Sequence, residues 1–420
     1  MKHVIIGNGP AGVIAAETLR RADPAAEVVL VGDENEPPYS RMAIPYLLTG
    51  NIAEAGTYLR KDVNHYACLG IRLVHARVER IDSAAREVVL ANGERLAFDR
   101  LLIASGSHPV RPPIPGIDLP GVHPCWTLAD ARQIAARAKP GARVVQLGAG
   151  FIGCIILQAL ADCGVKLTVV EMGDRMVPRM MTATAGNLIR QWVEKKGVKV
   201  HVNTKVEAIS AAGEAMKVKL SSGETLDADL LISAAGVRPN IAFLEGSGIK
   251  LNLGILVDAQ MQTSVAGIYA AGDVIETRGF HSGLPELNAI QPNAADQARV
   301  AALNMLGQPG MPVATQGSLA INVLDTLGLI STSFGHWQGV ASADGGEGVE
   351  LVDQAGFRYL SLQFQHDVLI GATSIGWTDH VGALRGLIQG RVRLGNWKAR
   401  LLADPTQFMA AYLGASQKAA

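Results

Sequence analysis

The segment His3–Gly12, HVIIGNGPAG, decides the fold of this chain. A short apolar run ends in a glycine-rich turn, a helical stretch follows to about Arg21, and Glu27–Val31 forms a second apolar run. The order strand, turn, helix, strand predicts a βαβ unit. Such a turn binds nucleotide phosphates, because the helix N-terminus offers free N–H groups and the positive end of the helix dipole.

Three glycines of the turn have separate roles in a unit of this kind. Gly7 allows the tight bend, Gly9 lets the backbone approach a pyrophosphate, and Gly12 lets the helix pack closely on the sheet. Asp33 and Glu34 follow the second strand, and either carboxylate could accept a hydrogen bond from a ribose hydroxyl. The sequence leaves open which of them does so, since a glycine occupies the strand end.

The same pattern recurs later in the chain. Ala142–Leu147 is an apolar run, Gly148–Gly153 (GAGFIG) is the turn, and Lys166–Glu171 is the strand after the next helix. Glu171 ends that strand, where a carboxylate accepts from an adenosine 2′-hydroxyl and repels the extra phosphate of NADP. Because Arg175 follows shortly after, the sequence favours NAD without excluding NADP.

Two βαβ units in one chain predict the α/β class. We expect two Rossmann-like domains, each doubly wound in three layers, and a C-terminal α+β domain. Pro-rich stretches at Arg111–Gly121 and Gly236–Asn240, and the segment Gly307–Pro312, indicate the crossings between them. The expected ranges are 1–112 and 240–312 for the first domain, 113–239 for the second, and 313–420 for the C-terminal domain.

A third motif lies at Ser264–Asp273 and ends in Ala-Ala-Gly-Asp. Its small residues permit a close approach of the backbone, so that Asp273 can reach a polyol. This motif alone is a modest signal, and together with the first glycine turn it becomes a strong one.

Composition and charge exclude several classes of function. Lys+Arg and Asp+Glu both number 38, so the net charge is zero and nothing global indicates nucleic acid or an anionic membrane surface. The first apolar run stops at Gly7, and no run of about 18 apolar residues occurs. We therefore expect a cytoplasmic protein without a secretory signal or a membrane-spanning helix.

The cysteines do not form a redox or metal motif. Cys68, Cys125, Cys154 and Cys163 are the four in the chain, and none are paired at C-x-x-C spacing. We expect all four to be buried free thiols, and we expect no metal site.

With these motifs in order, the chain resembles the FAD-dependent pyridine nucleotide-disulfide oxidoreductase superfamily. The landmarks are GNGPAG, the ASG of LLIASGSHP, GAGFIG, SAAGVRPN and YAAGDV, and they run from Val4 to about Leu306. The resemblance implies an FAD domain interrupted by an NAD domain, with FAD and NAD as cofactors. The expected cofactor-binding residues are Gly7, Gly9, Pro10, Ala11, Gly12, Asp33, Glu34, Arg41, Ala104, Ser105, Gly106, Gly148, Gly150, Phe151, Ile152, Gly153, Glu171, Gly236, Gly272 and Asp273.

The subtype follows from one short segment. Pro38–Arg41 is similar to a segment of ferredoxin and rubredoxin reductases and of the flavin module of NADH-dependent nitrite reductases. Met42 stands where other members of the superfamily carry a redox cysteine, and a thioether cannot act as a thiolate. Arg41 either contacts the flavin or forms a surface ion pair.

The resemblance implies an NADH-preferring flavoprotein oxidoreductase. Electrons would pass from NADH through FAD to a protein carrier, such as an iron–sulfur protein of the ferredoxin or rubredoxin type. The hydride step needs no side-chain acid or base, so no catalytic residue is assigned. Two alternatives remain: direct reduction of a small molecule (quinone, oxygen or disulfide), and a slowly turning over flavin- and NADH-binding protein with a signalling role.

A basic segment near the C-terminus bears on the acceptor. Arg385–Arg400, RGLIQGRVRLGNWKAR, has five basic residues and no acidic one. It is a docking surface for an acidic carrier, a solvated basic helix face, or a patch that pairs with acidic residues elsewhere in the fold.

Overall fold

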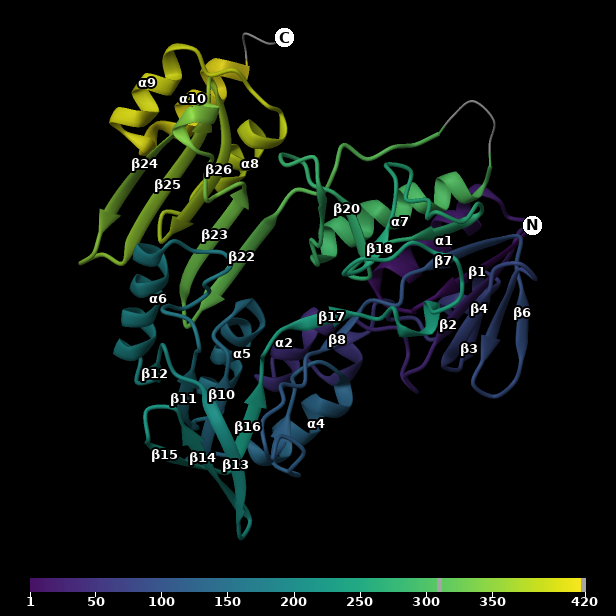
Figure 1. Cartoon of the computed structure of the whole chain (residues 1–420), viewed down its shortest axis with the longest axis horizontal. Helices are drawn as coiled ribbons and strands as arrows, with labels where there is room; N and C mark the ends of the chain where they lie inside the picture. The colour runs from purple at the N-terminus through teal and green to yellow at the C-terminus, as the bar shows by residue number, and fades with distance from the viewer. Residues whose placement is uncertain (308–311, 417–420) are drawn as a thin grey trace. The chain divides into compact units, whose positions relative to one another are not determined.

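The computed structural model describes residues 1–307 and 312–416, and it divides into two compact units (Figure 1). Unit 1 contains residues 1–43, 52–108 and 237–319, and unit 2 contains residues 44–51, 109–236 and 320–420. The predicted boundaries at residues 112, 239 and 312 stay predictions. Most of the predicted crossing at Gly307–Pro312 lies outside the described residues.

Unit 1 is built on a parallel sheet of five strands in the order β19-β7-β1-β2-β3. The strands are β19 (Ile268–Ala270), β7 (Arg100–Ile103), β1 (Lys2–Ile6), β2 (Glu27–Gly32) and β3 (Ile71–His75). One apolar core joins this sheet to α1 (Pro10–Ala22), α7 (Gln291–Met305) and the sheet β4-β5-β6 (Val78–Asp82, Glu87–Leu90, Arg95–Ala97). Alanines on the facing sides of α1 and α7 allow these two helices to pack closely.

The remaining elements of unit 1 are short. They are α3 (His65–Cys68), β18 (Ile255–Leu256), β20 (Ile275–Arg278), β21 (Pro285–Glu286), and the pair β8 (Ser107–Pro109) and β17 (Val237–Pro239).

Unit 2 repeats the parallel arrangement in the order β12-β11-β10-β16-β9. The strands are β12 (Lys199–His201), β11 (Lys166–Val170), β10 (Arg143–Leu147), β16 (Leu230–Ser233) and β9 (Val122–His123). The helices are α2 (Ile44–Leu48), α4 (Leu128–Arg137), α5 (Phe151–Asp162) and α6 (Ala183–Lys195), and an antiparallel sheet follows with β13 (Val206–Ala212), β14 (Ala215–Leu220) and β15 (Thr225–Ala228).

The C-terminal part of unit 2 is an antiparallel sheet in the order β22-β23-β26-β25-β24 (Figure 1). Its strands are β22 (Ile321–Thr326), β23 (Leu329–Gly335), β24 (Gly346–Asp353), β25 (Arg358–Gln365) and β26 (Val368–Ile375). The helices after this sheet are α8 (Val381–Gln389), α9 (Asn396–Ala403) and α10 (Phe408–Ser416). The predicted fold class, two Rossmann-like regions and a C-terminal α+β region, is confirmed.

The C-terminal sheet and the second Rossmann-like region share one apolar core. Leu324 and Leu329 belong to the same cluster of buried side chains as Ile156 of α5 and Val193 of α6. The Trp192 indole N–H donates to the Leu327 carbonyl at 3.0 Å. Packing through this core makes the two regions a single compact unit.

This shared core predicts a contrast between neighbouring residues of β22. Leu324 is 1% exposed, so Leu324→Ala should lower the free energy of unfolding by about 2–5 kcal/mol through lost burial and a cavity. Val323 is 56% exposed, so Val323→Ala should change it by less than about 0.5 kcal/mol. Denaturant unfolding followed by tryptophan fluorescence measures both, and equal costs would contradict the shared core.

Candidate functional site

The first glycine turn leaves the N-terminus of α1 open. Gly9 is the N-cap residue, no side chain caps the helix there, and a Cβ built on Gly9 meets nothing within 4 Å. Gly7 has φ +107°, and a Cβ there would overlap the Ala104 carbonyl, while one on Gly12 would overlap the Gly7 carbonyl. Free N–H groups beside open space fit an anionic group such as the FAD pyrophosphate.

The other predicted flavin segments come to the same edge of the sheet. The Ala104 N–H donates to the Ile6 carbonyl at 2.7 Å, so the ASG segment continues beside the turn. The Ala271 N–H donates to the Ile103 carbonyl at 3.0 Å, and a Cβ on Gly272 would lie 3.4 Å from the Cβ of Ala11. The carboxyl ends of β1, β7 and β19 therefore bring three predicted stretches together.

Two side chains that the sequence did not single out, Ser107 and Gln297, hold Asp273 and the preceding Gly272. The Ser107 hydroxyl donates to Asp273 Oδ2 at 3.0 Å, and the Gly272 N–H donates to Gln297 Oε1 at 3.0 Å. Burial raises the pKa of Asp273 above its usual range, against the opposing effect of the Ser107 hydrogen bond. The feature that could have pointed to this role is Gln297 itself, because it places a buried amide on the alanine-rich face of α7.

The structure distinguishes the two carboxylates after β2. Glu34 forms an ion pair with Arg41 at 2.7 Å and accepts from the Tyr39 hydroxyl at 2.5 Å. Asp33 is exposed. Arg41 is thus in an ion pair. Its guanidinium also donates to the carbonyl of Ser107, the first residue of β8, at 3.5 Å.

The ASG segment is also joined to the second crossing within unit 1. The Ser105 hydroxyl donates to the Asn240 carbonyl at 3.0 Å, and the Asn240 amide donates back to the Ser105 carbonyl at 2.7 Å. The Asn240 N–H donates to the Gly106 carbonyl at 2.9 Å. Asn240 therefore holds the segment that follows β7.

The second glycine turn repeats the geometry of the first in unit 2. Gly150 is the N-cap of α5 without a side-chain cap, and a Cβ on it meets nothing within 4 Å. A Cβ on Gly148 would lie 2.5 Å from the Ala234 carbonyl oxygen, and one on Gly153 would lie 2.5 Å from the Gly148 carbonyl oxygen. Phe151 and Ile152 form the first turn of α5. This open, uncapped helix N-terminus fits a second pyrophosphate.

Glu171 lies at the end of β11 and is 8% exposed. Its Oε2 accepts from the Ala149 N–H at 2.6 Å and its Oε1 accepts from the Gly173 N–H at 2.7 Å. The carboxylate is therefore fixed against the glycine turn. Arg175 is folded back, with donors to Asp174 at 2.7 Å and to the Met181 carbonyl at 3.0 Å. Gly236, with φ +99°, lies after β16.

The cysteines are free, but the prediction that all four are buried is wrong: Cys154 is buried, Cys125 and Cys163 are half-buried, and Cys68 is exposed. Burial raises the pKa of Cys125 and Cys154 to about 12, and it also raises the pKa of Cys163. These three thiols are poor nucleophiles, because the thiolate is the reactive form.

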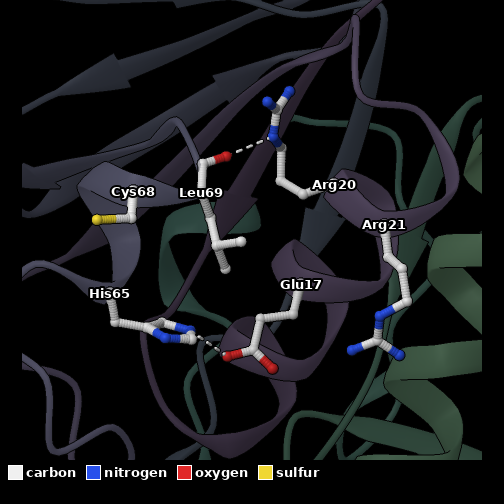
Figure 2. A pocket seen from close by; sticks show the side chains of 6 residues that line it. All are labelled: Glu17, Arg20, Arg21, His65, Cys68 and Leu69. Carbon is white, nitrogen blue, oxygen red and sulfur yellow. Dashed lines mark hydrogen bonds and ion pairs between the residues drawn. The ribbon is translucent and has the colours of Figure 1, made fainter.

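Cys68 lies on α3 and lines a hollow of about 380 Å³ beside the C-terminal half of α1 (Figure 2). Glu17 of α1 lies there, 2.9 Å from His65 Nε2. Because a helix rises about 1.5 Å per residue, the residues around Glu17 are roughly 10 Å or more along the axis from Pro10. Cys68 is thus far from the first glycine turn.

Two glycine turns at the carboxyl edges of two parallel sheets define a protein that binds two dinucleotides. Within the described residues, no cluster of His, Cys, Asp and Glu could hold a metal ion, and no helix is long and apolar enough to cross a membrane.

The chain belongs to the pyridine nucleotide-disulphide oxidoreductase family, which matches residues 1–301. It is an oxidoreductase that uses FAD and a pyridine nucleotide, as the resemblance implied.

Relatives cover different shares of the chain. It is 32% identical over 412 residues to the NADH-dependent phenylglyoxylate dehydrogenase subunit epsilon of Aromatoleum evansii, covering 96% of this chain and 95% of that protein. It is 32% identical over 311 residues to a rubredoxin-NAD(+) reductase of Pseudomonas putida, covering 73% and 80%. A solved NAD-dependent persulfide reductase from A. fulgidus superposes with a TM-score of 0.86 at 27% identity, covering 94% of this chain and 78% of that chain.

The two N-cap glycines give a paired prediction about cofactor binding. Gly9 and Gly150 have φ of −75° and −73°, which alanine adopts readily, so Gly9→Ala and Gly150→Ala should both fold. The added methyl group enters the space over one helix N-terminus. Gly9→Ala should lower the FAD content from the one per chain expected of the wild type, while Gly150→Ala should keep FAD and weaken NAD+ binding. Released flavin and calorimetric NAD+ binding measure these effects. Loss of both cofactors in both variants would contradict two separate sites.

Proposed function

We propose that this chain carries electrons between NADH and a protein electron carrier of the iron–sulfur type, through FAD. The observation that carries the proposal is that none of the chain's four cysteines provides a reactive thiol at the first glycine turn. Met42, 48% exposed, stands where relatives with thiol chemistry carry a cysteine. Cys68, on α3, lies beside the C-terminal half of α1 and away from the first glycine turn. Electrons on the flavin must therefore leave to an external acceptor.

The chain's own residues would bind and orient the cofactors. Gly9 and the free N–H groups of α1 would hold the FAD pyrophosphate, and Asp273, positioned by Ser107, would hold a polyol hydroxyl. Asp33 is the more available ribose acceptor, since Glu34 is bound by Arg41 and Tyr39. When bound, FAD supplies the hydride acceptor and can release electrons singly or in pairs.

The preference for NADH rests on Glu171 and Arg175. The Glu171 carboxylate is fixed at the second turn, where it can accept from a 2′-hydroxyl and would repel a 2′-phosphate. The Arg175 guanidinium is already bonded to Asp174 and to backbone carbonyls, so it offers little to a phosphate.

Removing the negative charge of Glu171 should reduce this preference. We expect Glu171→Gln to lower the ratio of flavin reduction by NADH to that by NADPH at least about tenfold, since a charge-assisted hydrogen bond and a charge repulsion are both lost. Arg175→Ala is the matched control and should leave the ratio nearly unchanged. Stopped-flow flavin bleaching measures both, and equal use of NADH and NADPH by the wild type would refute the assignment.

The full-length match favours a second arrangement of the same chemistry. The relative named as a dehydrogenase subunit matches 96% of the chain, whereas the rubredoxin reductase matches 73%. The chain would then be a permanent subunit, receiving electrons from an iron–sulfur partner and reducing NAD+. Co-purification of a partner, and NAD+ reduction by a prereduced carrier, separate this arrangement from a free reductase.

The two other candidates differ in turnover. A reductase of quinone, oxygen or disulfide would turn over rapidly with NADH and that small molecule alone. A signalling protein would be reduced slowly by NADH and would turn over with neither class of acceptor. The proposal requires fast flavin reduction and fast turnover only with a protein carrier.

The segment Arg385–Arg400 supports an acidic partner. Arg393 and Arg400 are exposed and line a hollow of about 330 Å³ together with Trp397, over whose ring the Arg400 guanidinium lies at 4.7 Å. Lys398 is paired with Glu347 at 2.8 Å and is less available. A half-buried indole ring with one guanidinium over its face and a second exposed arginine on the same hollow suits docking to a protein with carboxylates on its surface.

Charge reversal tests this surface. Arg393→Glu/Arg400→Glu should reduce turnover with an acidic iron–sulfur carrier at low ionic strength by about tenfold or more, while flavin reduction by NADH stays unchanged. Lys205→Glu/Lys250→Glu changes the net charge equally at exposed positions elsewhere and should have a small effect. Wild-type turnover should fall as salt rises. If both double variants behave alike, the segment is not the docking surface.

A further inference from the structure

Gln146 is a buried amide near the carboxyl end of β10, the central strand of the second Rossmann-like sheet. Gln146 is 0% exposed, and its strand lies between β11 and β16 in the sheet. Its Nε2 donates to the Gly148 carbonyl at 2.9 Å, whereas its Oε1 has no hydrogen-bond partner among the described residues. A half-satisfied buried amide is unfavourable for folding, because desolvating the oxygen costs free energy that no hydrogen bond returns.

The fold of a glycine turn does not require this amide. In the first turn, Ile5 occupies the same place, two residues before Gly7, and it is also 0% exposed. The two turns otherwise repeat each other, with a positive φ at Gly7 and at Gly148 and an open N-cap glycine in each. A polar residue that breaks the apolar pattern of a core strand without need is expected where function requires it.

The amide connects to Glu171 through a single peptide unit. Gln146 donates to the carbonyl of the Gly148–Ala149 peptide, and the N–H of that same peptide donates to Glu171 Oε2 at 2.6 Å. The other carboxylate oxygen is held by the Gly173 N–H at 2.7 Å. Hydrogen bonds in such a chain strengthen one another, because a donor at the carbonyl oxygen polarises the peptide and makes its N–H a better donor.

We propose that Gln146 is a positioning residue for coenzyme selection: it fixes the Gly148–Ala149 peptide and thereby the orientation of the Glu171 carboxylate toward the 2′-hydroxyl of NAD. The inference rests on the proposed role of Glu171. It adds that a buried side chain of β10 orients the Glu171 carboxylate, and that burying this side chain with an unpaired oxygen costs folding free energy.

A double-mutant cycle on oxidised, FAD-loaded protein tests the coupling. The variants are Gln146→Ile, which installs the residue of the first turn, Glu171→Gln, and both together, with Gln146→Met as a second variant if isoleucine does not fold. Gln158→Met is the matched control, because the Gln158 amide of α5 donates to Asp162 at 2.6 Å in a hydrogen bond that is exposed. Calorimetric dissociation constants for NAD+ and NADP+, flavin content and the thermal midpoint are measured for each.

Gln146→Ile should weaken NAD+ binding by about threefold to tenfold, corresponding to the loss of one hydrogen bond, and should lower the NAD+/NADP+ selectivity by a similar factor. In the Glu171→Gln background the same change should have an effect below about twofold, because coupled residues are not additive. Flavin content should stay constant, and the thermal midpoint should not fall. A purely structural role would lower the midpoint and weaken both nucleotides equally.

The outcomes separate the two claims. If Glu171→Gln leaves the selectivity unchanged, the assignment of Glu171 fails and this inference with it. If Glu171→Gln lowers the selectivity while neither Gln146 variant does, or if the effects of the two positions add, only the role of Gln146 is overturned.

Discussion

Each dinucleotide site depends on the contact between the third glycine of its turn and the carbonyl of the first. A Cβ on Gly12 would overlap the Gly7 carbonyl, and one on Gly153 would lie 2.5 Å from the Gly148 carbonyl oxygen. Only hydrogen fits in these places, so α1 and α5 begin directly at the edges of their sheets. Without this contact the helix N-termini would move away from the strands, and the phosphate sites would be lost.

The two sites use their carboxylates in different ways. In unit 1, Glu34 is neutralised by Arg41, and Asp273 is oriented by the hydroxyl of Ser107. In unit 2, the hydrogen bonds that Glu171 accepts from the described residues come from backbone N–H groups, and none of these residues forms an ion pair with it. Backbone donors fix the position of a carboxylate without cancelling its charge, so Glu171 keeps its negative potential beside the second glycine turn.

The C-terminal sheet packs against the second nucleotide region and does not form a separate unit. Trp192 of α6 donates to the Leu327 carbonyl and packs edge-on against Phe357 with ring centroids 5.1 Å apart. The Thr182 hydroxyl, at the start of α6, donates to the Tyr359 hydroxyl at 2.9 Å. A partner bound at Arg393 and Trp397 would therefore contact a region that shares its core with α5 and α6.

The sequence by itself determined the two βαβ units, the order of the landmarks and the class of cofactor, because turn glycines and apolar runs act locally. It also predicted the α+β class of the C-terminal region. Only the tertiary structure decided what depends on distant segments. The engagement of Glu34 by Arg41, the support of Asp273 by Ser107, the exposure of Cys68 and the connection from Gln146 to Glu171 all arise from contacts across strands and loops. The physical reason is that hydrogen bonds and burial depend on which distant chain segments come into contact, and a local sequence pattern does not specify those contacts.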